Sequence, residues 1–245
     1  MERRLVIGTC RSGSTALLHA LSQHPDTECL YQPIKSGLRM QGRPNYDFFE
    51  QEMEGEGQFL IAKETIGHKT PEECTLKVFP DKESCRATRP CFIFRDPAST
   101  YGSWVALGWG SLESFITSYL HTFDLFQEAT RVSGQASAIA HEGLVVDPET
   151  VLRQLCERWN LPYDDRLVNW NNQLGRDSPI QRWIHEGSSR GFEAEHHAKL
   201  RESTTFSQME STVALPLDQM VIIRERLDAV YARIKDSPVF LKPRL

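Results

Sequence analysis

Eight residues near the start of the chain, GTCRSGST at positions 8–15, constrain the fold more than any other segment. A short apolar run at 5–7 precedes them, and good helix formers follow at 16–21. This pattern predicts a strand, then a turn bounded by glycines, then a helix. In that arrangement the unpaired N–H groups at the helix N-terminus face a bound anion. The alternative is an ordinary glycine–serine turn, because the GxxxxG spacing alone is a weak pattern.

The residue types in this loop narrow the kind of anion. Ser14 stands where a nucleotide triphosphatase has the lysine that holds the β- and γ-phosphates. Arg11 supplies a cation three residues earlier, while Ser12, Gly13 and Thr15 offer hydroxyls and backbone donors. The segment therefore predicts a phosphate or sulfonate site without the usual grip on a γ-phosphate.

Length and charge bound the remaining possibilities. A chain of 245 residues suits a single α/β domain over 1–245, and a net charge of −5 argues against general nucleic-acid binding. The start of the chain is too short in apolar residues for a signal peptide, and no run of about 18 apolar residues follows, so we expect a cytoplasmic protein without a membrane segment. The six cysteines have no CxxC spacing, which predicts buried thiols and no metal site.

Apolar runs of strand length recur at 5–7, 27–30, 59–62, 91–94 and 136–140, with helical patterns between several of them. This alternation predicts a three-layer P-loop-like α/β fold around a parallel sheet of about five strands. The clearest helices begin at Pro148, after the N-cap Asp147, and at Leu217. Between them, residues 165–216 are rich in polar residues, glycine and serine, and predict a loop-rich helical cap.

A second anion site is predicted in CFIFRDPASTYGSW, at 91–104. Arg95 ends the fourth apolar run, and Ser103 lies eight residues later, after Asp96 and Pro97 open a turn or helix. One or two helical turns would return the hydroxyl to the guanidinium and form a phosphate clamp at the carboxyl edge of the sheet. The alternative is a surface turn with an exposed serine.

Together the two segments resemble the sulfotransferases that use 3′-phosphoadenosine 5′-phosphosulfate (PAPS). RSGST at 11–15 is similar to that family's 5′-phosphosulfate loop, and the spacing from Arg95 to Ser103 is similar to its 3′-phosphate motif. The stretch HEGLVVDPETVLRQLCERWNLPYD at 141–164 resembles the family's following strand-and-helix segment. The resemblance implies a PAPS-binding enzyme with 3′,5′-bisphosphoadenosine (PAP) as product and no need of Mg²⁺, which accounts for the missing lysine.

Two residues depart from the family pattern. Cys10 stands where many members have proline, and Arg11 replaces the lysine of cytosolic animal enzymes. The arginine is common in bacterial-type members and keeps the positive charge, so the resemblance still implies that Arg11 serves the leaving phosphate.

The resemblance also places the lysine and the general base at the end of the third strand, in AKETIGHKT at 62–70. His68 has the pKa of a base near neutrality, whereas Glu64 needs burial or a neighbour to raise its own. Glu64 occupies the position after the lysine, so we favour it over His68 and expect Lys63 to contact the transferring group. The alternative is a solvated loop of ordinary surface charges.

Two further expectations concern the rest of the site. Arg190 and Gly191 match part of the basic-glycine loop that the family places over the 3′-phosphate, and a surface turn explains them equally well. Residues after strand ends or near the second motif either line an apolar acceptor pocket or belong to the core: Tyr31, Gln32, Pro33, Trp104, Trp109, Phe115 and Tyr119.

These expectations describe the transfer of a sulfuryl group from PAPS to a hydroxyl or amine of a small-molecule acceptor. Two other functions stay open from the residues alone. One is a degenerate P-loop kinase or phosphotransferase, and the other is a nucleotide-binding module without catalysis.

Overall fold

The computed structural model describes residues 1–50, 57–171, 174, 180–182, 197–207 and 213–244. Within them, seven strands form one sheet in the order β6-β2-β3-β1-β4-β5-β7, and every neighbouring pair is parallel. The strands are β1 (Glu2–Thr9), β2 (Thr27–Tyr31), β3 (Phe59–Ile66), β4 (Cys91–Phe94), β5 (Ser137–Ala140), β6 (Ile180–Arg182) and β7 (Phe240–Leu241). The five predicted strands are confirmed, and two short edge strands extend the sheet.

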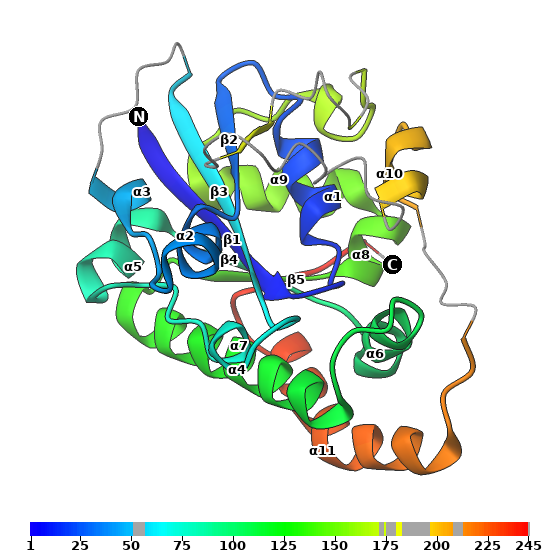
Figure 1. The fold of residues 1–245 in the computed structure, drawn as a ribbon. Coiled ribbons are helices and arrows are strands. Elements are labelled where there is room, and N and C mark those ends of the chain that lie inside the picture. Colours follow the sequence, from blue (N-terminus) through cyan, green and yellow to red (C-terminus); the bar gives the residue numbers. More distant parts are fainter. Residues whose placement is uncertain (51–56, 172–173, 175–179, 183–196, 208–212, 245) are drawn as a thin grey trace.

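Helices connect the strands and cover both faces of the sheet (Figure 1). They are α1 (Ser14–Leu21), α2 (Pro33–Gln41), α3 (Asp47–Glu50), α4 (Pro71–Cys74), α5 (Lys82–Thr88), α6 (Pro97–Val105), α7 (Leu112–Ser133), α8 (His141–Val146), α9 (Pro148–Trp159), α10 (Ala198–Glu202) and α11 (Leu217–Lys235), with a 3₁₀ turn η1 (Asp165–Leu167).

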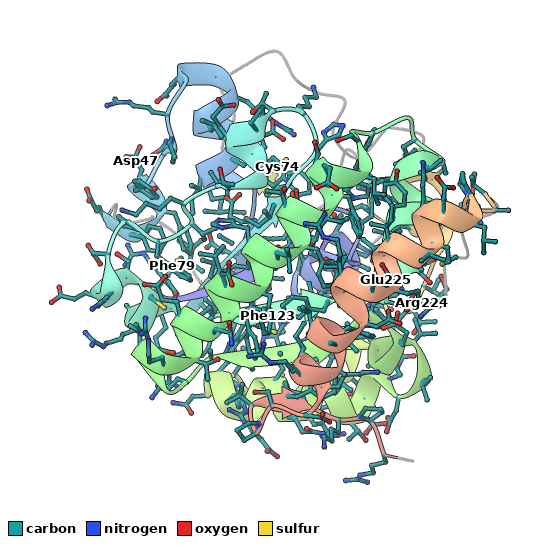
Figure 2. All side chains as sticks on the ribbon, turned by 90° about the horizontal axis from the view of Figure 1, so that it is seen from below. Asp47, Cys74, Phe79, Phe123, Arg224 and Glu225 are labelled. Carbon is teal, nitrogen blue, oxygen red and sulfur yellow. The ribbon has the colours of Figure 1, made fainter. Side chains whose placement is uncertain are left out.

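Successive side chains along a strand point to opposite faces of the sheet and so belong to two separate hydrophobic cores. Leu5 and Ile7 of β1 belong to the core under α7 and α11, whereas Val6 between them packs with α1 and α9. Figure 2 shows α7 and α11 side by side, with Phe123 of α7 between them. The predicted three-layer architecture, helices on both faces of a parallel sheet, is confirmed.

Both predicted helices have the expected starts and apolar faces. The Asp147 side chain accepts a hydrogen bond from the Thr150 amide, and Pro148 occupies the first turn of α9. On α11 the buried residues Ile223, Leu227 and Ile234 recur at helical spacing. All six cysteines are buried and unpaired, as predicted. Among the helices that the structure describes, none is long and apolar enough to cross a membrane.

Candidate active site

The predicted catalytic and anion-binding residues among the described part of the chain lie towards the carboxyl ends of three neighbouring strands, β3, β1 and β4. Lys63 and Glu64 are near the end of β3, Arg11 follows β1, and Arg95 follows β4. His141, which was not predicted as a site residue, directly follows β5. In an open parallel sheet this edge is where ligands bind.

The loop after β1 has the backbone of a tight anion-binding turn. Gly13, at φ 95°, is the left-handed N-cap of α1, and Arg11 is also left-handed, at φ 75°. A Cβ on Gly13 would lie 2.4 Å from His141 Nδ1, and one on Gly8 would lie 2.3 Å from Ser12 Oγ. Close contacts therefore favour glycine at both positions, and the left-handed backbone at Gly13 also favours it.

A hydroxyl and a helix N-terminus at this loop are open to a ligand in the part of the chain that the structure describes. The Ser12 hydroxyl is buried and makes no hydrogen bond to any residue that the structure describes. No side chain caps the N-terminus of α1, which begins at Ser14. Because buried polar groups in proteins are nearly always paired, an oxyanion at this position would satisfy both the hydroxyl and the helix amides.

A hydrogen bond joins the two motifs. Arg11 Nε donates to Ser103 Oγ over 2.9 Å, so the loop after β1 is tied to the second turn of α6. Arg95, buried at the end of β4, is near enough that its charge adds to burial in lowering the pKa of Arg11. The predicted residues Arg11, Arg95 and Ser103 are thus brought together, and Ser103 accepts its bond from Arg11.

His141 lies against the loop from the β5 side. It is 6% exposed, and neither ring nitrogen has a hydrogen-bond partner among the described residues. Burial, followed by the positive charge of Arg95, lowers the pKa of His141 to about 4, so the ring is neutral at neutral pH. Its place immediately after a parallel strand was the sequence signal that could have identified it.

Lys63 and Glu64 are adjacent on β3 and therefore point to opposite faces of the sheet. Lys63 Nζ donates to Thr15 Oγ1 of α1 over 3.2 Å and lies 4.0 Å from the Tyr31 ring centre. The amine is fully desolvated next to the anion loop, and this burial lowers the pKa of Lys63 to about 7.

Glu64 lies at the N-terminus of α2 on the other face. Its carboxylate accepts the backbone N–H groups of Ile34, at 2.7 Å, and Lys35, at 3.3 Å. Burial raises the pKa of Glu64 to about 7, although these two donors act in the opposite direction. The carboxyl group therefore caps a helix and also has the proton affinity of a base near neutrality.

His68 lies two residues beyond β3, half-buried, with a left-handed backbone at φ 115°. Its ring centre is 3.9 Å from that of Trp109, and the same tryptophan lies 5.9 Å from the Arg11 guanidinium. Burial, with the charges of Lys35 and Arg39, lowers the pKa of His68 to about 4. His68 is a weaker base than Glu64 but is the more accessible of the two.

A buried ion network supports the loop from behind. Lys35 Nζ lies 3.0 Å from a Glu73 carboxylate oxygen and donates to the Gly67 carbonyl, and Cys10 Sγ is 3.6 Å away. Arg39 pairs with the other Glu73 oxygen at 2.8 Å. The network ties α2 and α4 to Cys10 in the anion loop and to Gly67, which follows β3.

The remaining predicted residues divide into three groups. Trp104, Phe115 and Tyr119 are fully buried core residues, and the Trp104 indole donates to the Cys10 carbonyl over 2.8 Å. Tyr31 and Trp109 are only partly buried at the site itself. Gln32 and Pro33 are buried at the start of α2, while Arg190 and Gly191 lie outside the described residues.

The fold is similar to that of solved sulfotransferases. Mouse sulfotransferase SULT7A1, complexed with PAP, matches with a TM-score of 0.57 at 14% identity, over 96% of this chain and 87% of that one. A sulfotransferase from Alicyclobacillus acidocaldarius matches with a TM-score of 0.52 at 13% identity, over 96% of this chain and 95% of that one. No family model and no curated protein sequence matches the chain. The chain therefore has a sulfotransferase-type fold.

Proposed function

We propose that this protein is a sulfotransferase that moves a sulfuryl group from PAPS to a hydroxyl or amine of a small-molecule acceptor. The observation that carries the proposal is the hydrogen bond between Arg11 and Ser103, which unites the two anion motifs at one edge of the sheet. The likeness of the whole fold to sulfotransferases supports it.

The residues present fit such a donor. Arg11, Ser12 and Thr15, with the amides at the start of α1, would hold the 5′-phosphosulfate, and the unpaired Ser12 hydroxyl favours an oxyanion there. Arg95 and Ser103 would hold the 3′-phosphate. His141 lies against Gly13 and near enough to Arg95 to be affected by its charge, and its ring nitrogens have no partner among the described residues.

PAPS supplies an activated sulfuryl group, with PAP as the leaving group. Arg11 and the loop amides would stabilise negative charge on the leaving phosphate, because they are fixed donors in a desolvated site. Lys63, whose Nζ lies 3.2 Å from Thr15 Oγ1, would contact the transferring group from the β3 side. Arg190 and Gly191 are proposed to complete the 3′-phosphate site.

Glu64 is proposed to take the proton of the acceptor. Its pKa of about 7 suits this role, whereas His68, with a pKa of about 4, holds a proton poorly. Tyr31 and Trp109 are the partly buried aromatic residues that would contact a small apolar acceptor. The acceptor is proposed to be neither nucleic acid nor membrane lipid, and the protein is proposed to act in the cytoplasm without Mg²⁺.

Calorimetric titration with PAP, and separately with ATP and Mg²⁺, tests the donor class without knowledge of the acceptor. We expect PAP to bind in the presence of EDTA, and Mg-ATP to bind at least about tenfold more weakly because Ser14 replaces the P-loop lysine. A preference for Mg-ATP would favour a phosphotransferase, and binding of neither would overturn the proposal.

A second measurement separates an enzyme from a binding module. Protein that binds PAP is incubated with ³⁵S-labelled PAPS and a panel of phenols, alcohols and amines. Transfer of label to any acceptor that is lost in Lys63→Ala protein supports catalysis, while PAP binding without transfer would indicate a module that only binds the nucleotide.

A further inference from the structure

The peptide bond between Arg95 and Asp96 is held at both ends by side chains. The Arg95 carbonyl accepts a hydrogen bond from Tyr119 Oη of α7 over 3.1 Å. The Asp96 amide donates to Glu142 Oε1 of α8 over 2.9 Å. This single peptide unit, between β4 and α6, is therefore fixed by two other helices.

Glu142 is itself fixed from the C-terminal helix. Tyr231 Oη of α11 donates to Glu142 Oε2 over 2.7 Å, and the tyrosine is only 8% exposed. Helix α11 packs beside α7 over the same face of the sheet, as Figure 2 shows. The tyrosines on these two helices thus reach the same peptide unit, Tyr119 directly and Tyr231 through a carboxylate.

We infer that Tyr231 is a positioning residue for Arg95 and acts through Glu142. The inference rests on the proposed function, in which Arg95 binds the 3′-phosphate of the donor. The Tyr231 hydroxyl keeps the Glu142 carboxylate on the Asp96 amide.

Two physical effects support this role. The plane of the Arg95–Asp96 peptide fixes the direction from which the Arg95 side chain leaves the backbone, and Asp96 is the N-cap of α6, which carries Ser103. A tilt of this plane therefore moves both proposed ligands of the 3′-phosphate.

The second effect is electrostatic. Burial lowers the pKa of Arg95, and the nearby charge of Glu142 opposes this effect by favouring the guanidinium. Without the Tyr231 hydroxyl, Glu142 Oε2 would lose a donor in a partly buried place and would turn to Arg95. Its negative charge would then compete with the phosphate for the same arginine.

The test compares nucleotides with and without a 3′-phosphate. Affinities for PAP and for AMP are measured by calorimetry with wild-type protein and with Tyr231→Phe, Glu142→Ala and the double variant. Arg95→Ala is the positive control. Tyr163→Phe is the matched control. Tyr163 follows α9, and the substitution removes a buried hydroxyl with no partner among the described residues.

We expect Tyr231→Phe to weaken PAP by about 3- to 30-fold while AMP changes less than twofold. In the Glu142→Ala background the same substitution should have no further effect, because the tyrosine acts through the carboxylate. Tyr163→Phe should leave both affinities unchanged.

Three outcomes would overturn the inference. The first is unchanged PAP affinity in Tyr231→Phe, the second is an equal loss for PAP and AMP, and the third is a full additional loss in the double variant. Each would exclude a relay through Glu142. The proposed function would still stand if Arg95→Ala weakens PAP and spares AMP. If Arg95→Ala itself spares PAP, the 3′-phosphate assignment fails and the inference fails with it.

Discussion

At the scale of single residues, the identity of the base is the sharpest question. The pKa of Glu64 is raised to about 7 by burial, and that of His68 is lowered to about 4. A base must be deprotonated to accept the acceptor proton, so a Glu64 base makes kcat/KM rise with pH through about 7. A His68 base would place that rise near pH 4 and leave the rate flat from about pH 5 to 8.

We therefore predict a kcat/KM limb near pH 7 that disappears in Glu64→Gln protein, with a loss of about 10²–10⁴ in rate. The measurement is a pH profile with the best acceptor of the panel. His68→Gln is the matched variant and should keep the limb. A wild-type profile that is flat from about pH 5 to 8, with the rate lost in His68→Gln and kept in Glu64→Gln, would assign the base to the histidine.

The contact of Gly13 with His141 gives a second prediction at this scale. Gly13→Ala introduces a Cβ methyl group that would lie 2.4 Å from His141 Nδ1, on a residue whose backbone has a φ of 95°. We expect it to lower the free energy of unfolding by about 1–3 kcal/mol, the range for a strained backbone. Urea unfolding of Gly13→Ala, His141→Ala and the double variant measures the two parts.

The double variant should be less destabilised than the sum of the single ones, because His141→Ala removes the steric contact and leaves only the backbone strain. Additive losses would show that the histidine ring moves aside without cost. In that case the close packing of the loop against β5 does not fix the position of His141.

At the scale of elements, the Lys35–Glu73–Arg39 network holds α2 and α4 together. Glu73 is 1% exposed, and Glu73→Gln leaves the buried Lys35 ammonium without its carboxylate. We expect a loss of about 3–5 kcal/mol in the free energy of unfolding, measured in urea. Glu149→Gln, which breaks an exposed pair with Arg153 on α9, should leave the midpoint unchanged. Equal midpoints for both variants would contradict a structural role for the network.

The Glu73 carboxylate also makes the free energy of unfolding depend on pH in the acid range. Burial would raise the pKa of Glu73, but the hydrogen bond from Arg39 and the charges of Lys35 and Arg39 lower it to about 2. Because this value lies below the unfolded-state value of about 4.3, the stabilisation is present above that pH and is lost as the pH falls towards 2. The loss of stability between these two pH values should be smaller in Glu73→Gln protein.

The elements themselves could be predicted because their signals are local. Each of the five main strands contains a short apolar run, and α9 and α11 carry an N-cap or an apolar stripe of helical period. The two-residue strand β7 and the three-residue β6 exist only through pairing with β5 and β2, which no local pattern reveals. Local patterns therefore predict the five main strands and not the two short edge strands.

The site could be predicted only where residues that lie together in the structure are also close in the sequence. The loop at 11–15 and the pair Arg95 and Ser103 have motif spacing, whereas the bond from Arg11 to Ser103 spans 92 positions and depends on β1 and β4 being neighbours. The separation of Lys63 from Glu64 follows from strand alternation once β3 is known to include both. His141 has no motif of its own, and only its place after β5 marks it.

At the scale of the whole molecule, the proposed donor ligands come from the loops after β1, β4 and β5, which are adjacent at the centre of the sheet. A nucleotide that binds all three loops stabilises the folded chain by mass action, because the unfolded chain has no such site. At about 100 times Kd this amounts to about 2.7 kcal/mol, and for a chain of this size it should raise Tm by about 5–11 °C.

We predict this rise with PAP in EDTA, a smaller rise with AMP, and none that requires Mg²⁺. Differential scanning calorimetry of wild-type and Arg95→Ala protein provides the measurement and its control, since the difference between PAP and AMP should be smaller in the variant. The difference between the two nucleotides isolates the loop after β4, because only PAP carries the phosphate assigned to it. A larger rise with Mg-ATP than with PAP would contradict the assignment, and would mean that the loop at 11–15 binds a γ-phosphate even though Ser14 replaces the lysine.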